Sequence, residues 1–222
     1  MTKILTKELV HRLFPRYIDL FTELNNNVLF YKTVSKKIEG CKEFEDRTSY
    51  YKYLNENILK NQAIDYLEFG VYKGDSIADW SSINSHQESR FFGFDSFEGL
   101  PERFDKSHPK GDFNANGQIP QINDKRVKFV KGLFQKTLPE FLSEFKVKSQ
   151  LVINIDCDLY SSTLYSLTQL NSIIKPDTII LFNVFGNLQH EFLAFYDYVR
   201  SYNRDFQLIC RRGWSDVAIK MK

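Results

Sequence analysis

The regular alternation of strand-like and helix-like segments after residue 63 constrains the fold of this chain most strongly. Short apolar runs predict strands at residues 64–69, 91–95, 127–131, 151–156 and 178–182. Helical spacing of apolar residues predicts helices near residues 76–85, 138–145, 162–174 and 191–202. Such alternation is typical of a parallel sheet wound on both faces by helices.

The end of the chain departs from this alternation. Residues 206–210 and 217–221 are both strand-like, and only a short connection separates them. Parallel neighbours need a long crossover, so this pair is expected to form an antiparallel hairpin. The predicted fold class is therefore α/β, a Rossmann-like doubly wound sheet with a C-terminal antiparallel hairpin.

The first sixty residues are expected to be helical. Helical spacing occurs over residues 8–14, 28–38 and 49–59, with interruptions at Pro15 and at the three asparagines 25–27. We predict that residues 1–60 form an extension that covers the sheet, gates the site or mediates dimerisation. Residues 61–222 then form one α/β domain, which fits a chain of 222 residues.

Composition argues against several classes of partner. Thirty basic and 28 acidic side chains give a net charge of +2, and no basic block is present, so nucleic acid is not expected. No apolar run is long enough to span a membrane. Three widely spaced cysteines and the lack of an apolar leader favour a cytoplasmic location.

Residues 66–76, Y-L-E-F-G-V-Y-K-G-D-S, predict a nucleoside cofactor site at a strand end. Gly70 and Gly74 let the backbone turn and approach a ligand, and the helix that opens near Ser76 directs N–H groups toward it. The spacing differs from that of dinucleotide sites, and Glu68 would repel a pyrophosphate. A carboxylate there suits the sulfonium and amine of S-adenosylmethionine. The alternative is that both glycines only shape a tight turn.

Asp95 ends the next predicted strand, where a ribose-binding carboxylate is expected. The alternative is that Asp95 caps the segment that follows. That segment, residues 97–126, is the longest stretch without periodicity and is rich in glycine and proline. We expect it to be a lid over the methyl acceptor, with an insertion of no function as the alternative.

Polar residues follow the next two predicted strands. Asp156 and Asp158 end a strongly apolar strand, and Asn183 ends the following one. Ligands of open α/β sheets bind at these carboxyl ends. One acid could hold a cation or the substrate while the other takes a hydroxyl proton; alternatively one caps a helix or pairs with a lysine. His190, at the next helix start, is a further catalytic candidate, or a local cap.

Three motifs resemble the macrocin-type O-methyltransferases, which methylate sugars on macrolides and related natural products. They are E-F-G-V-Y-K-G-D-S at 68–76, G-F-D-S-F-E-G-L-P-E at 93–102 and I-D-C-D-L-Y-S-S-T at 155–163. The resemblance covers about residues 60–222. It implies a class I methyltransferase fold, S-adenosylmethionine as donor, and commonly a magnesium-dependent transfer to a sugar hydroxyl.

The resemblance also implies roles for individual residues. Asp158 would be the general base and Asp156 a metal ligand; Asp156 and His190 are also the further catalytic candidates. The expected cofactor-binding residues are Glu68, Gly70, Tyr72, Gly74, Ser76, Asp95, Ser96, Gly132 and Asp156. The family usually has two adjacent acids after the fifth strand, whereas this chain has Asn183 and Val184. A Mg²⁺ site made of Asp156 and Asn183 would therefore be weak.

Three functions are consistent with these features. The leading one is an O-methyltransferase acting on a small hydroxylated acceptor, with a sugar favoured. The alternatives are an N-methyltransferase of similar fold and a protein that binds S-adenosylmethionine without catalysis. Asp156, Asp158 and the lid motif rank O-methyl transfer first. The aromatic-rich N-terminal helices are compatible with a homodimer.

Overall fold

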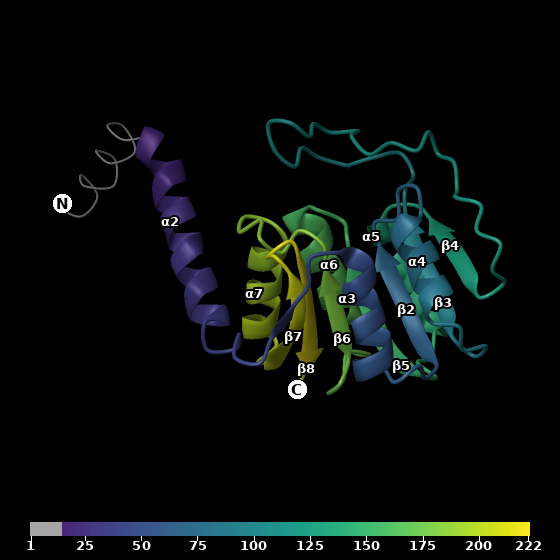
Figure 1. Cartoon of the computed structure of the whole chain (residues 1–222). Helices are drawn as coiled ribbons and strands as arrows, with labels where there is room; N and C mark the ends of the chain where they lie inside the picture. The colour runs from purple at the N-terminus through teal and green to yellow at the C-terminus, as the bar shows by residue number, and fades with distance from the viewer. Residues whose placement is uncertain (1–14) are drawn as a thin grey trace.

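The computed structural model describes residues 15–222, and an eight-stranded sheet forms their centre (Figure 1). The strands lie in the order β1-β7-β8-β6-β5-β2-β3-β4. Their bounds are β1 Lys42–Glu43, β2 Ile64–Phe69, β3 Arg90–Asp95, β4 Val127–Lys131, β5 Gln150–Ile155, β6 Ile179–Phe182, β7 Phe206–Arg212 and β8 Asp216–Met221.

The strand directions confirm the predicted fold class. The neighbours from β4 through β3, β2 and β5 to β6 are all parallel. Strand β8 lies between β6 and β7 and is antiparallel to both, with Phe182 opposite Val217. Strands β7 and β8 thus form the antiparallel hairpin that the short connection between them predicted.

Helices cover both faces of the sheet. Helices α5 (Phe134–Glu144), α6 (Tyr160–Leu170) and α7 (Glu191–Ser201) lie on one face. Helix α3 (Arg47–Tyr53), the π-helical turn η1 (Leu54–Ile58) and α4 (Asp75–Ile83) lie on the other. Helix α2 (Pro15–Val34) stands at the edge of the molecule (Figure 1). No helix among the described residues is both long and apolar enough to cross a membrane.

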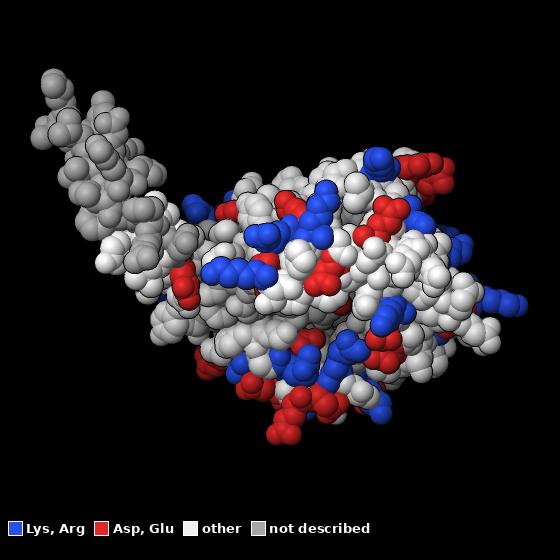
Figure 2. All heavy atoms as spheres, turned by 90° about the horizontal axis from the view of Figure 1, so that it is seen from above, with Lys and Arg blue, Asp and Glu red and all other residues white. Residues whose placement is uncertain are grey.

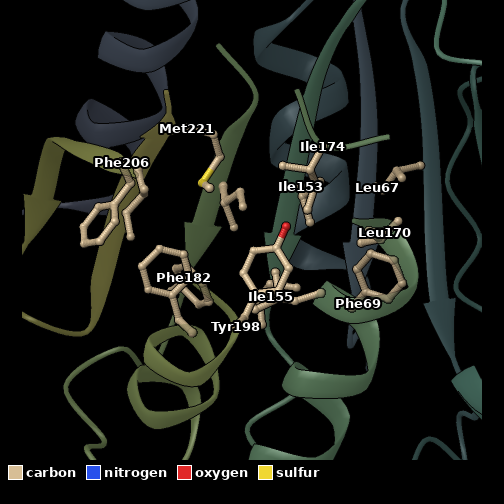
Figure 3. Close-up of a cluster of buried hydrophobic side chains, with 14 of the residues drawn as sticks. Leu67, Phe69, Ile153, Ile155, Leu170, Ile174, Phe182, Tyr198, Phe206 and Met221 are labelled. Carbon is tan, nitrogen blue, oxygen red and sulfur yellow. The ribbon is translucent and has the colours of Figure 1, made fainter. Parts of the chain in front are cut away.

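Alternating strand residues divide the core between these two faces. Leu67 and Phe69 of β2 point to the face of α5, α6 and α7, whereas Tyr66 points to the face of α3 and α4. On the first face, Phe182 and Tyr198 pack with the strand residues (Figure 3). A sheet buried on both faces explains why the central strands read as continuous apolar runs.

The N-terminal segment differs from the sequence expectation in two ways. The predicted break at residues 25–27 is wrong, because α2 is continuous and Asn27 donates a side-chain hydrogen bond to the Glu23 carbonyl, 2.8 Å away. Strand β1 is unpredicted; its two exposed residues give no pattern and pair with the edge of β7. The helix expected at residues 8–14 lies outside the described residues.

The predicted boundary near residue 60 stays a prediction. Helix α3 and η1 contribute the fully buried Tyr50, Tyr51 and Leu54 to the core, so this part of the N-terminal segment packs against the sheet. The expectation that the segment covers the sheet therefore applies to residues 47–58.

Residues 97–126, called the lid segment below, lie between β3 and β4 and contain no helix. Their only strand-like pairing is an isolated bridge between Glu98 and Asn114. The loop rises beyond the carboxyl ends of the parallel strands in Figure 1. Its base is closed by a hydrogen bond from the Gly117 N–H to the Phe97 carbonyl, 2.7 Å away. A long loop at this edge of the sheet, with residues 97 and 117 joined, is placed to cover a ligand.

Candidate active site

The carboxyl ends of β2, β3 and β5 meet closely at Gly70. Its N–H donates to the Phe94 carbonyl at 3.0 Å, and the Asp156 N–H donates to the Phe69 carbonyl at 2.9 Å. Gly70 has φ +90°, and a Cβ there would lie 1.9 Å from the Asp156 carbonyl oxygen. Glycine is therefore required by the approach of two strand ends, in addition to any approach of a ligand.

Asp95 organises the loop that follows β2. Its Oδ2 accepts the N–H groups of Val71 at 2.7 Å and Tyr72 at 2.8 Å, and its Oδ1 accepts that of Phe97 at 2.8 Å. Tyr72 has φ 52°, a left-handed conformation that such a clamp stabilises. One carboxylate thus fixes the turn before α4 and the beginning of the lid segment.

A cleft of about 240 Å³ opens over these strand ends. Seven residues predicted from the sequence line it: Gly70, Tyr72, Asp95, Ser96, Gly132, Asp156 and Asp158. Leu133 and Phe113 also line the cleft and are 41% and 39% exposed. Exposed apolar surface beside carboxylates suits a ligand with a flat apolar ring and polar groups, such as the adenosine of S-adenosylmethionine.

Gly74 and Ser76 do not line the cleft. Gly74 has φ +85°, and a Cβ there would lie 3.0 Å from the side chain of Pro120, so this glycine packs against the lid segment. Ser76 is buried in the first turn of α4, 3.4 Å from the Arg47 guanidinium. Both residues therefore contact parts of the protein that surround the cleft and not the cleft itself.

Glu68 is fully buried and also lies outside the cleft lining. Its Oε2 accepts hydrogen bonds from the Tyr66 hydroxyl at 2.5 Å and the Asn154 amide at 3.1 Å. Burial raises the pKa of Glu68 to about 8 despite these bonds. The side chain is thus largely protonated at neutral pH, and any electrostatic effect on a cofactor is weaker than a free carboxylate would give.

Asp156 and Asp158 bring two carboxyl groups into the cleft. Burial, and then repulsion from Asp158, raise the pKa of Asp156 to about 7. Burial raises the pKa of Asp158 to about 6, while His108 of the lid segment lowers it. Asp158 has φ 60°, so a left-handed turn presents it at the start of α6. Strained backbone of this kind is common at functional sites.

His190 joins the lid segment to α6. Its Nδ1 accepts the Tyr160 N–H at 3.2 Å, and its Nε2 lies 3.0 Å from the Phe104 carbonyl, to which it donates because Nδ1 is the acceptor. The Phe104 ring centroid is 4.6 Å away. Burial lowers the pKa of His190, so the ring is neutral with both nitrogens engaged.

The sequence predicted either a catalytic role or a local capping role for His190, and the structure bears on both. The side chain makes no capping hydrogen bond at the start of α7, and it does not line the cleft. The neighbouring Glu191 is buried and accepts the Val184 N–H at 2.9 Å. The geometry therefore favours a positioning role for His190 over proton transfer to a substrate.

The residues near Asn183 do not fit a magnesium site. The Asn183 amide donates to Asn154 at 3.3 Å, and Val184 offers no side-chain oxygen. In the described part of the chain, no three His, Cys, Asp or Glu side chains are grouped so that they could hold a metal ion. Mg²⁺ needs about six oxygen ligands in near-octahedral geometry. Asp156 and Asn183 therefore do not provide the set of oxygen ligands that Mg²⁺ needs.

Sequence reasoning missed several residues of the cleft. They are Val71, Gly99, Leu100, Pro101, Phe113, Leu133, Phe134, Gln135, Cys157 and Ser162. Most of them directly follow a strand end, and that position was a usable signal because ligands of such sheets bind there. Phe113 lies inside the lid segment, where no periodicity marks it.

The fold is that of the class I methyltransferases. The solved O-methyltransferase NovP matches with a TM-score of 0.59 and 20% identity over 78% of each chain. The calicheamicin methyltransferase CalS11 matches with a TM-score of 0.62 and 19% identity, covering 99% of this chain and 90% of its own. A second CalS11 structure, described as a TDP-rhamnose 3′-O-methyltransferase, gives a TM-score of 0.56 at 18% identity and covers 99% and 92% of the two chains.

The family follows from the sequence itself. The model of the macrocin O-methyltransferase (TylF) family matches residues 45–209, so the chain belongs to that family. The protein is an S-adenosylmethionine-dependent O-methyltransferase, as the three motifs predicted. No curated protein matches the sequence.

Proposed function

We propose that the protein methylates a hydroxyl group of a small, sugar-like acceptor bound in the cleft beneath the lid segment. The observation that carries this proposal is the position of Asp158, a carboxyl group in the cleft that is influenced by His108, Asp105 and Asp112 of the lid segment. The TDP-rhamnose activity of CalS11 supports a sugar acceptor.

Asp158 acts as general base in this proposal. When bound, S-adenosylmethionine supplies the methyl group and becomes its demethylated product. The Asp158 carboxylate accepts the proton of the acceptor hydroxyl as the oxygen bonds to the methyl carbon. Asp156 orients the acceptor or the cofactor from the end of β5, and alignment supplies much of the rate.

The cofactor is held by the residues that line the cleft. Gly70, Tyr72 and Asp95 come from the loop after β2 and the end of β3, and Gly132 follows β4. Ser96 and Asp156 complete the predicted set within the cleft. Glu68, Gly74 and Ser76 support this surface from behind and are expected to affect affinity indirectly.

The lid segment covers the acceptor. Glu102 accepts a hydrogen bond from Ser161 at the start of α6, and His190 holds the Phe104 carbonyl. Tyr72 contacts Phe113 with ring centroids 5.8 Å apart, which joins the cofactor loop to the lid. Closure would exclude water from the methyl transfer and position the acceptor over Asp158.

A small-molecule acceptor is also consistent with the surface that surrounds the lid. Figure 2 shows basic and acidic side chains mixed over the upper face, without an extended area of one sign. The three cysteines are free, which supports the proposed cytoplasmic location. The predicted homodimer remains a proposal, and its interface is argued below.

The Asp158→Asn substitution tests the proposed base. We expect kcat to fall by about 10²–10⁴-fold, because a positioned general base contributes that much, while S-adenosylmethionine affinity changes little. The assay follows the demethylated product by mass spectrometry with TDP-rhamnose and a panel of free and nucleotide-linked sugars. Asp177→Asn, an exposed acid beside Lys220, is the matched control. Full turnover in the Asp158 variant would remove this residue from the mechanism.

A further inference from the structure

Helix α2 carries a large exposed apolar stripe, defined here as Leu20, Phe21, Leu24, Val28 and Tyr31. These side chains are between 48% and 71% exposed. A single exposed leucine needs no explanation, but a contiguous apolar surface of this size on one helix marks an interaction site. Nothing in the proposed methyl transfer uses this surface.

The body of the protein holds α2 through a different side. Asn26 is buried and donates to the Leu188 carbonyl at 3.2 Å. Phe30 packs its ring against Phe192 at 5.0 Å and Trp214 at 4.9 Å. Figure 1 shows the first half of α2 pointing away from the sheet and its helices. Within residues 15–222, the apolar stripe therefore remains largely exposed while the helix itself is anchored.

The apolar stripe has the seven-residue spacing that is typical of paired helices. Leu24 and Tyr31 are seven residues apart, as are Phe21 and Val28. A seven-residue repeat keeps one face of a helix against a neighbouring helix over several turns. The expected occupant of this face is thus another helix.

The order of residues along α2 allows a second copy of the same helix to pack in antiparallel orientation. With Leu24 at the twofold axis, Leu20 of one copy faces Val28 of the other, and Leu24 faces its own equivalent. Such an isologous contact closes with two copies.

Charge favours the same orientation. Residues 15–24 contain one basic and two acidic residues, whereas residues 25–34 contain one basic residue, Lys32, and no acid. An antiparallel pair therefore places the net negative half of each helix beside the net positive half of the other. A parallel pair would align halves of like sign, which is unfavourable.

The exposed apolar area is enough for a small interface. The five side chains of the apolar stripe present roughly 550 Å² per protomer, so a pair could bury roughly 1,100 Å² in total, just above the roughly 1,000 Å² that a biological interface should clear. We propose that the protein forms a twofold homodimer in which the apolar stripes of two α2 helices pack antiparallel. This interface lies outside the cleft and does not rest on the proposed acceptor.

Leu24→Glu tests the interface by placing two like charges at the twofold axis. Sedimentation velocity and light scattering of the full chain at micromolar concentration should give twice 26.2 kDa for the wild type and 26.2 kDa for this variant. Thr22→Glu, on the opposite side of α2 and also exposed, is the matched control and should remain dimeric. Circular dichroism and thermal unfolding check that both variants fold.

Orientation is tested by cysteine pairing. A mixture of Leu20→Cys and Val28→Cys proteins should form a disulfide between the two variants under oxidation, whereas Leu20→Cys alone should not form a disulfide-linked dimer through that position. A monomeric wild type would overturn the proposal, whether residues 1–14 or another protein cover the stripe. A Leu24→Glu dimer, or rapid cross-linking of Leu20→Cys to itself, would overturn it as well.

Discussion

Asp158 lies between the interior of the protein and the charged residues of the lid segment, and its proton affinity reflects both. Burial raises its pKa to about 6, His108 lowers the value, and Asp105 and Asp112 raise it. A base must be deprotonated to accept the acceptor proton. Activity should therefore rise with pH through this value and level off above it.

The acid limb of the pH profile is the range over which activity rises with pH. Single substitutions in the lid segment should shift this limb in opposite directions. His108→Gln removes a stabilising charge, so the limb should shift to higher pH, whereas Asp112→Asn should shift it to lower pH. The profile of kcat/KM against pH, measured for the three proteins, checks this. The shifts should be small because both side chains are partly exposed and solvent screens their charges. Shifts of the same sign in both variants would contradict the assignment of Asp158.

The sequence predicted the individual site residues unevenly. Asp95 and Asp158 could be predicted because acids at strand ends of such a sheet point to the ligand edge. The burial of Glu68 could not, because β5, which supplies the hydrogen bond from Asn154, is far from β2 in the sequence. The sequence also explained only part of the need for glycine at position 70, because the Asp156 backbone that a Cβ would meet comes from the end of another strand.

At the scale of elements, the lid segment and α6 are joined through His190. Its ring accepts the Tyr160 N–H and donates to the Phe104 carbonyl, so the side chain holds the loop near the start of α6. Local hydrogen bonds of this kind can decide how often a loop opens. His190 is therefore expected to act on the lid and not on the substrate proton.

His190→Ala should loosen the lid segment. We expect faster amide hydrogen exchange over residues 97–126 and an increase of about tenfold in the KM for the acceptor, because two hydrogen bonds are lost. His86→Ala, in the loop before β3, is the matched control and should leave the exchange of the lid unchanged. Unchanged exchange in the His190 variant, or a loss of kcat alone with an intact lid, would contradict the positioning role.

The sheet elements were easier to predict than the N-terminal helix. Strands such as β2 and β5 are buried on both faces, so their apolar runs are unambiguous. In α2, the three asparagines indicated a break, but Asn27 bonds within the helix and Asn26 binds the body of the protein. Tertiary contacts thus override a weak local preference.

For the whole molecule, the insertion of β8 between β6 and β7 defines the fold. The short connection in the sequence implied a hairpin, but the position of that hairpin within the sheet depends on contacts with β6. The family match to residues 45–209 begins just before α3, and α2 lies outside it. The proposed antiparallel α2 interface therefore lies outside the region that the family model matches.

Cofactor binding can be measured by calorimetric titration of the full chain with S-adenosylmethionine and with its demethylated product, in magnesium and then in chelator. We predict micromolar binding of both compounds that does not depend on the metal, and at least about tenfold weaker binding to Asp95→Asn, since this substitution disturbs the loop after β2. Asp177→Asn should bind like the wild type. Absence of binding by the wild type under both conditions would contradict the conclusion that the protein uses S-adenosylmethionine.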